Sequence, residues 1–453
     1  MDREDLKTPS TTENGWARAR ARLQMTAAVV LSCAVAAPAF GQVPSALIRE
    51  GDALPAAGAG QVVTSLTNTA TNHVGGYAVG ISTSDGGSTL SHIWGNAAGG
   101  VGALLRSEAT YGTFVQESFE SFYGMSNTGQ LAYSSIGSDP PLTSLDSVWL
   151  DDTPVIIEEQ PVTALPGQYW TFGSRPSVSA DGVPHWVGGI SSIQGGSTEN
   201  RVLASTMAGA IALQTGQTPA GLPAEIDGID FDYRYSALSS HYIAPVTMNL
   251  STAIDGTIVV DGAGLSLGGT LVQEGNPVPP AIGGIGGENW DNFDFTGHTE
   301  DGQWFFTGDT DGNTATDEII VKNGLITIRE GDTLDGEVLG GSIEGAYMNE
   351  NGDVAFIWDV AAGTLEALYL NERLLVTEGD EVDWDGDGVV DAGYALTDFT
   401  GTSTLTISDR DGSNDVDVYF TADIAVPGAG TLEGFFRVTA TSVPVELQTF
   451  TVE

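Results

Sequence analysis

The chain has 453 residues, which is room for one large domain or for two or three ordinary ones. Glycine is abundant, at 60 residues, and only 17% of residues are charged, so short elements joined by tight turns are favoured over long helices. Sixty acidic residues against 15 basic ones give a net charge of -45, which argues against nucleic acid or an anionic membrane surface as a partner, because both would be repelled.

The N-terminus has the pattern of a secretory signal peptide. Three arginines precede an apolar run that begins at Met25, and Ala37 and Ala39 have the spacing that a signal peptidase prefers. We therefore expect residues 1–39 to be a signal peptide and residues 40–453 to form one extracytoplasmic domain. The single cysteine lies in the signal peptide, so the mature protein has no disulfide, and no later apolar segment reaches the ~18 residues of a membrane span.

A short acidic motif recurs along the chain. Four plain copies, "LIREGDALP", "LVQEGNPVP", "TIREGDTLD" and "LVTEGDEVD", begin at Leu47, Leu271, Thr327 and Leu375. Together with looser copies, they recur at intervals of about 50 to 60 residues, a period typical of propeller blades. An apolar hairpin precedes the copies, most clearly in "EIIVKNGLITIREGD".

A second pattern, an Asn/Asp-Gly turn between two alternating runs, lies upstream of each hairpin, as in "MSNTGQLAYSS" and "YMNENGDVAFIWD". Each unit therefore predicts four strands, here called a to d, and about seven such units predict an all-β, seven-bladed β-propeller of four-stranded blades. The first strands of the seven blades are expected to begin near Gln61, Glu117, Tyr169, Asp230, Asp291, Gly341 and Asp398.

The last unit has only three strands of its own. The missing fourth strand is expected to be "SALIREGD" at the mature N-terminus, which has the outer-strand motif but no other strand of a blade before it. Pairing this N-terminal strand in the last blade would close the ring and remove exposed sheet edges.

Two resemblances follow from these motifs. "RPSVSADGVPHWVG" resembles the blade of TolB-type propellers, and "NENGDVAF" with "IREGDALP" is similar to secreted bacterial tandem-repeat proteins of the choice-of-anchor kind. The second resemblance covers most of the mature chain. It implies an extracytoplasmic propeller and carries no activity with it.

Alternating aspartates in "DWDGDGVVD" predict a calcium site. Numbered as a calcium loop, Asp383, Asp385, Asp387 and Asp391 supply carboxylates and Val389 a carbonyl, while a glycine at the sixth position permits the bend. The position of the usual bidentate glutamate holds a tyrosine, and no helices flank the loop, so this is not a complete EF-hand. The alternative is an acidic turn that binds nothing.

Two weaker acidic strings lack the glycine and are better explained as solvated turns. They are Asp309, Asp311, Asn313 and Asp317 in one string, and Asp409, Asp411, Ser413 and Asp415 in the other. His185 and His241, at corresponding places in neighbouring units, could converge near the propeller axis, although packed core histidines are the commoner outcome. "GLSLG" matches the letters of a nucleophile elbow but lies among strands.

Two classes of function stay open. The first is a secreted, calcium-stabilised, monomeric propeller that binds a protein, glycan or surface ligand without catalysis. It is favoured because the sequence shows no catalytic residue set and its blades vary independently. The alternative is a propeller enzyme, a hydrolase or lyase with a metal-assisted site at the axis.

Overall fold

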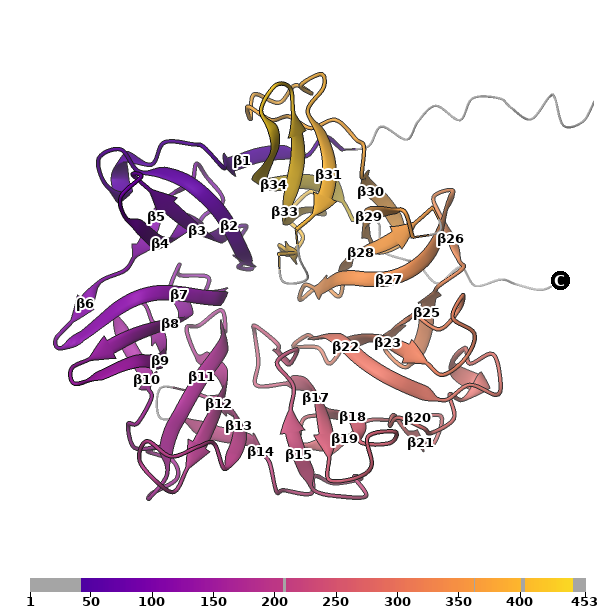
Figure 1. Cartoon of the computed structure of the whole chain (residues 1–453). Coiled ribbons are helices and arrows are strands. Elements are labelled where there is room, and N and C mark those ends of the chain that lie inside the picture. The colour runs from indigo at the N-terminus through magenta and orange to yellow at the C-terminus, as the bar shows by residue number, and fades with distance from the viewer. Residues whose placement is uncertain (1–41, 207–208, 362, 401–403, 443–453) are drawn as a thin grey trace, which may run out of the picture. The chain divides into compact units, whose positions relative to one another are not determined.

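The computed structural model describes residues 42–442, except 207–208, 362 and 401–403, and it does not describe the side chains of residues 121–122. The predicted signal peptide lies outside the described residues. Seven blades stand around a common axis, each an antiparallel sheet whose first strand is innermost (Figure 1). The predicted all-β, seven-bladed propeller is confirmed.

The first three blades are regular. Blade 1 contains β2 (Val62–Thr71), β3 (Tyr77–Ser84), β4 (Thr89–Asn96) and β5 (Ala103–Ser107). Blade 2 contains β7 (Phe114–Met125), β8 (Leu131–Asp139), β9 (Leu142–Leu150) and β10 (Thr153–Ile157), with the short β6 (Thr110–Tyr111) beside β7. Blade 3 contains β11 (Tyr169–Val178), β12 (Pro184–Ser191), β13 (Asn200–Ser205) and β14 (Ala210–Gln214).

Blade 4 is the least regular, as its sequence indicates. It contains β15 (Ile226–Ile229) and β16 (Arg234–Tyr235), both paired with β17 (Tyr242–Met248), then β18 (Gly256–Val260) and β19 (Ala263–Gly264). A small hairpin, β20 (Ser266–Leu267) and β21 (Thr270–Leu271), and two 3₁₀ turns, η1 (Pro55–Ala57) and η2 (Pro280–Ile282), lie outside the blades.

Blades 5 and 6 return to the regular pattern, whereas in blade 7 two short strands, β31 and β32, both pair with β33. Blade 5 contains β22 (Trp290–His298), β23 (Trp304–Thr310), β24 (Ile319–Lys322) and β25 (Leu325–Arg329). Blade 6 contains β27 (Glu337–Met348), β28 (Val354–Val360), β29 (Leu365–Leu370) and β30 (Arg373–Thr377), with β26 (Thr333–Leu334) beside β27. Blade 7 contains β31 (Ala395–Phe399), β32 (Thr406–Ile407), β33 (Asp415–Val426) and β34 (Gly430–Thr441).

The N-terminal strand completes blade 7. β1 (Ser45–Arg49) pairs antiparallel with β34, from Ser45 opposite Arg437 to Arg49 opposite Gly434 (Figure 1). The predicted closure is therefore confirmed, and the ring leaves no open edge between its first and last blades.

The recurrent "EGD" motif fastens each blade to the next. The Glu378 carboxylate accepts a hydrogen bond from Glu366 N in the third strand of its own blade (3.1 Å), whereas that of Glu330 accepts from Gly341 N in the first strand of the next blade (3.1 Å). The glycine has a positive φ, 93° at Gly379, and its N–H bonds to the first strand of the next blade, at Leu396 O (2.8 Å). The aspartate caps the turn, as Asp380 does by accepting from Thr377 N (2.9 Å). The motif repeats because each blade needs the same crossover.

The turns between first and second strands form a ring of hydrogen bonds at one end of the axis. Glu350 of blade 6 accepts from the N–H groups of Ala237 in blade 4 (2.6 Å) and Glu300 in blade 5 (2.7 Å). His73 Nδ1 lies 2.5 Å from Asp409 Oδ2, which joins blade 1 to blade 7. The remaining junctions are Asn72 Nδ2 to Ser126 O (3.1 Å), Asn127 N to Ala180 O (3.2 Å), Ala180 N to Ala237 O (2.7 Å) and Glu350 N to Asp409 Oδ1 (2.9 Å).

The apolar core lies between neighbouring blades. Each cluster of buried side chains draws on two adjacent sheets, for example Val187 and Leu203 of blade 3 with Ile226 and Val246 of blade 4. This burial stabilises the ring because each blade covers one face of its neighbour.

Candidate functional site

A cavity lies where the first strands of six blades converge. It has a volume of about 100 Å³ and is lined from β2, β7, β11, β16, β27 and β32, with one residue from β12. The titratable and aromatic residues of this axial cavity are His73, Tyr123, Arg175, His185, Tyr233, Arg234, Tyr235 and Tyr347.

Irregularities in two first strands occur at two of these residues, Arg175 and Arg234. The pairing of β11 with β12 shifts between Ser174 and Ser177, and the first strand of blade 4 is interrupted between β15 and β16. Arg175, within the β11 bulge, has a φ of 55°, a left-handed conformation that costs a non-glycine residue about 1–2 kcal/mol. Strained positions of this kind cluster at functional sites, and this one carries a cavity residue.

His185 is the residue whose environment is hardest to explain by packing alone. Its side chain is only 3% exposed, and neither ring nitrogen has a hydrogen-bond partner among the described residues. The ring stacks on Tyr235 with a centroid distance of 3.9 Å, and the Tyr235 hydroxyl is likewise buried without a partner. Burial lowers the pKa of His185 to about 4, so the imidazole is neutral at pH 7 and offers one donor and one acceptor.

His92 shows that this fold can satisfy a buried histidine. It is 2% exposed, yet Nδ1 lies 2.9 Å from Ser107 Oγ and Nε2 lies 2.9 Å from Thr83 Oγ1. An unsatisfied buried polar group costs about 1–3 kcal/mol. The unfilled nitrogens of His185 therefore indicate a place where a ligand can supply hydrogen bonds.

Two arginines line the same cavity. Arg175 Nη1 lies 3.7 Å from Asp232 Oδ1, and burial lowers the pKa of Arg175, as does the positive charge of Arg234. Arg234 Nη1 donates to Tyr233 O (2.9 Å), and its guanidinium lies 5.8 Å from the centre of the Tyr347 ring. Among the described residues, no carboxylate lies within ion-pair distance (4.0 Å) of Arg234.

The sequence analysis did not single out the arginines: Arg175 is only the first residue of the turn pattern "RPSVSADGVPHWVG", and Arg234 belongs to no quoted motif. The available signal is their rarity, since only ten basic residues follow residue 41 and two of them line this cavity. His185 was predicted to lie near the axis and does line the cavity, whereas His241 does not. His241 precedes β17 at the surface, where it pairs with Asp261 (2.7 Å) and stacks on His298 (5.4 Å).

The predicted calcium loop, residues 383–391, lies against the ring-closing strand. This acidic loop follows β30, and Asp383 forms a parallel bridge with Ser45, through Ala46 N to Asp383 O (2.9 Å) and Asp383 N to Pro44 O (3.0 Å). Ser45 Oγ also donates to Asp383 Oδ2 (2.7 Å). The loop is thus part of the closure of blade 7.

Three of the four predicted carboxylates of the acidic loop come together. One oxygen from each of Asp383, Asp385 and Asp391 lies within 4.8 Å of the others, a spacing that can hold a cation. Asp387 is outside this group, and its Oδ1 accepts from Val389 N (2.8 Å). Asp383 is fully buried and also accepts from the N–H groups of residues 386, 387 and 388, so much of the loop's acceptor capacity is used by its own backbone.

The two weaker acidic strings do not gather within the described part of the chain. Asp309 faces the buried Glu318, whose pKa burial raises to about 10. Two other members accept hydrogen bonds within their own turns: Asn313 from Ala315 and Asp411 from Ser413. The rest interact with residues outside their strings: Asp311 accepts from Asn289, Asp415 accepts from Thr441, Asp317 lies near Glu330, and Asp409 lies near His73.

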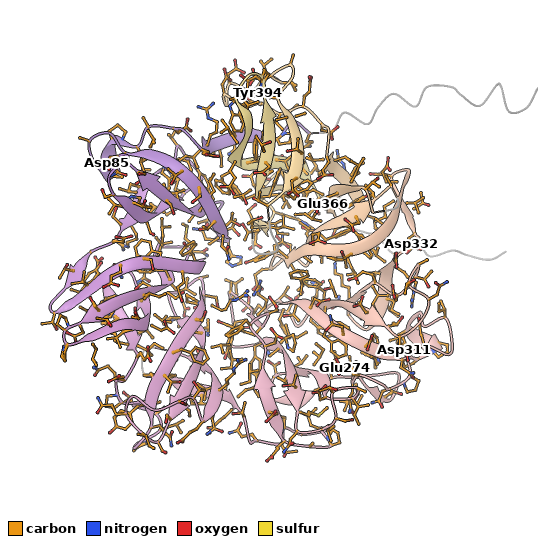
Figure 2. All side chains as sticks on the ribbon, viewed as in Figure 1. Asp85, Glu274, Asp311, Asp332, Glu366 and Tyr394 are labelled. Atoms are coloured by element: carbon orange, nitrogen blue, oxygen red, sulfur yellow. The ribbon has the colours of Figure 1, made fainter. Side chains whose placement is uncertain are left out.

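The structure contains a further acidic cluster that the sequence did not predict. Glu344, Asp359, Glu366, Glu378 and Asp398, from blades 6 and 7, form two overlapping groups that share Glu366. Figure 2 labels Glu366. Burial raises the pKa of Glu366 to about 7. These residues come from five separate strands and turns, so no local spacing in the sequence predicts the cluster.

No family model matches the chain, and no curated protein matches it either. Solved structures with distant similarity include prolyl oligopeptidase B from Galerina marginata (10% identity, TM-score 0.39), which covers 88% of this chain and 52% of its own. PorZ of the Porphyromonas gingivalis type-IX secretion system is 12% identical, with 83% of this chain and 60% of PorZ covered and a TM-score of 0.33. An N11 neuraminidase-like protein of an H18N11 bat virus is 10% identical, with 89% of this chain and 99% of that protein covered and a TM-score of 0.32. The chain spans about half the length of the peptidase, and similarities this weak say nothing of activity.

Across the described residues, no helix is long and apolar enough to span a membrane.

Proposed function

We propose that this chain is an extracytoplasmic binding propeller, without catalysis, that holds a small polar ligand in its axial cavity. The observation that carries the proposal is His185, a buried neutral imidazole with two unfilled hydrogen-bonding positions in a cavity lined by six blades. Small-molecule sites combine an enclosed, partly aromatic wall with a few convergent polar groups, and the axial cavity has both.

The alternative, an enzyme with a metal-assisted site at the axis, fits this lining less well. The three carboxylate groupings that could hold a cation, among the residues the structure describes, contain no residue of the axial cavity. The cavity instead presents two guanidinium groups, which repel a divalent cation. These observations support recognition over metal-assisted hydrolysis.

The proposal includes calcium as a structural cation at the acidic loop. Asp383, Asp385 and Asp391 supply carboxylate oxygens, the ligand type that calcium prefers, beside the strand that closes the ring. A cation there would reduce the repulsion among these carboxylates and stabilise the loop where it contacts β1.

A fragment screen tests the binding proposal. Ligand-observed NMR with a library of small neutral, cationic, zwitterionic and anionic fragments should detect binding to the parent and a loss of binding in His185→Phe. His241→Phe is the matched control, because His241 lies outside the axial cavity, and it should bind as the parent does. If no fragment binds the parent, or if binding persists in His185→Phe, the proposal is wrong.

A further inference from the structure

The charges around the axial cavity point to the class of its ligand. Arg175 and Arg234 line it, and together they place two guanidinium groups at the same cavity. Asp232, 3.7 Å from Arg175 Nη1, and Asp230 are the carboxylates whose charges act on Arg175, and neither is among the residues that line the cavity. Of the other charged groups nearby, Asp409 is already paired with His73 (2.5 Å). In a chain with a net charge of -45, this cavity is a local site for an anion.

Arginine geometry favours a carboxylate among the anions. A guanidinium group offers a planar fork of N–H donors that matches the two oxygens of a carboxylate. Arg234 gives Nη1 to the carbonyl of Tyr233 and has no carboxylate of the described chain within 4.0 Å, so its other donors can meet a ligand. The left-handed backbone of Arg175 holds the second guanidinium at the same cavity.

The stacked His185–Tyr235 pair adds a second requirement. Both side chains are neutral at pH 7, since burial lowers the pKa of His185 to about 4 and raises that of Tyr235 above its usual value. Neither has a partner for its polar atoms among the described residues. A hydroxyl group, which both donates and accepts, fits an imidazole and a phenol that each do the same.

The volume limits the size of the ligand. An apolar cavity of about 150 Å³ takes up benzene, which has six non-hydrogen atoms. The axial cavity, at about 100 Å³, therefore suits a ligand of roughly four to six such atoms.

We propose that the axial cavity binds a small hydroxy acid, with its carboxylate at the two arginines and its hydroxyl group at the His185–Tyr235 pair. This inference rests on the proposed function and names the ligand class of the same site.

Calorimetry with matched small molecules tests it on the full mature chain. Glycolate and lactate should bind, acetate should bind about tenfold more weakly because it lacks the hydroxyl group, and lactamide should bind at least tenfold more weakly than lactate because it lacks the charge. Inorganic phosphate should bind more weakly than lactate.

Two variants locate the contacts. Arg234→Gln should weaken lactate about tenfold or more, and Tyr235→Phe should reduce the preference for lactate over acetate. Arg201→Gln is the matched control: its guanidinium lies 5.2 Å from the Phe231 ring, as that of Arg175 does at 5.5 Å, but Arg201 is outside the cavity. Thermal melting checks that each variant is folded, and Arg175→Gln replaces Arg234→Gln if the latter is not.

The outcomes separate the two proposals. If lactamide binds as well as lactate, or phosphate binds more tightly, the hydroxy-acid inference is wrong while a binding site at the axis stands. If Arg201→Gln weakens lactate as much as Arg234→Gln, the arginine contact is wrong. If the fragment screen detects no ligand of any charge, the proposed function itself fails.

Discussion

The acidic loop and the axial cavity differ in how their polar groups are satisfied. Asp383 accepts hydrogen bonds from three N–H groups of its own loop and from Ser45, so its carboxylate has partners before any ligand arrives. His185 is just as well buried, yet both its ring nitrogens lack a partner among the described residues. The loop is conspicuous in the sequence, while the cavity is assembled from residues hundreds of positions apart.

This difference shows what local spacing can and cannot indicate. Asx residues that alternate with glycine make their own turns, because their short carboxylates reach nearby N–H groups. The same geometry satisfies the oxygens that a cation would otherwise use. A site formed by convergence of blades has no such local partners, and its unsatisfied groups become visible only in three dimensions.

The largest effect should come from removing the strand on which the acidic loop rests. Deleting residues 43–52 removes the pairing of β1 with β34 and the buried Ile48, and we expect unfolding to become easier by more than about 5 kcal/mol. Chemical denaturation measures the change. The control deletes residues 194–197, part of an exposed turn, and its free energy of unfolding should fall much less. Equal losses would contradict the closure role.

The acidic cluster at the junction of blades 6 and 7 consists of carboxylates that are far apart in the sequence, unlike those of the acidic loop. The pKa of Glu366 is about 7 in the folded chain, above its unfolded value of about 4.3, so its stabilising contribution is complete below pH 4.3 and is lost as pH rises through 7. Glu366→Gln should raise stability at pH 8 by about 1–2 kcal/mol, a value discounted for partial exposure, and change little at pH 4.

Thermal melting in chelator across this pH range checks the prediction. The exposed Glu372, changed to glutamine, is the control and should leave the pH dependence as it is in the parent. A Glu366→Gln variant whose melting temperature falls with rising pH as steeply as the parent's would count against this origin of the pH dependence.

The response to calcium should differ between variants of two nearby aspartates of the acidic loop, Asp385 and Asp387. Several millimolar calcium, compared with excess chelator, should stabilise the parent by roughly 1 kcal/mol if the site is as weak as a low-affinity calcium site. Asp385→Asn should lose this gain, because Asp385 belongs to the group of three carboxylates. Asp387→Asn should keep it, since Asp387 is outside the group although each residue accepts one N–H bond within the turn. Equal calcium responses in all three proteins would mean that the loop is an acidic turn.

The smallest expected effect concerns the cavity without ligand. Tyr235→Phe removes a buried hydroxyl group that has no partner within the described structure, so stability should stay the same or rise by about 0.5–1 kcal/mol. Tyr133→Phe is the matched control and should destabilise by about 1 kcal/mol, because its hydroxyl donates to Asp151 O (2.8 Å). Urea unfolding measures both, and a loss of stability in Tyr235→Phe would mean that its hydroxyl is satisfied.

The repeats predicted the architecture because each blade depends on the same two local devices. The "EGD" crossover and the Asn/Asp-Gly turn are short-range patterns, and the expected strand starts at Gln61 and Tyr169 fall within one residue of β2 and β11. The N-terminal strand was found for the same reason, since it carries the crossover motif without a blade of its own.

The cavity could be predicted only in part. His185 follows the turn glycine of its blade at the regular distance and reaches the axis. His241 does not, because blade 4 lacks that glycine and its second strand begins only at Tyr242. Arg175 and Arg234 depend on a bulge and an interrupted strand, which are irregularities that a repeat pattern does not encode.

The closure of blade 7 has a consequence for synthesis of the chain. β1 is the first strand of the domain to leave the ribosome, and its partner β34 is among the last, with nearly 400 residues between them. The first strand must therefore wait unpaired while six blades are made, and any chain cut short before β34 keeps two open sheet edges. Such a chain is exposed to proteases and to aggregation, because the ring can close only after β34 has been synthesised.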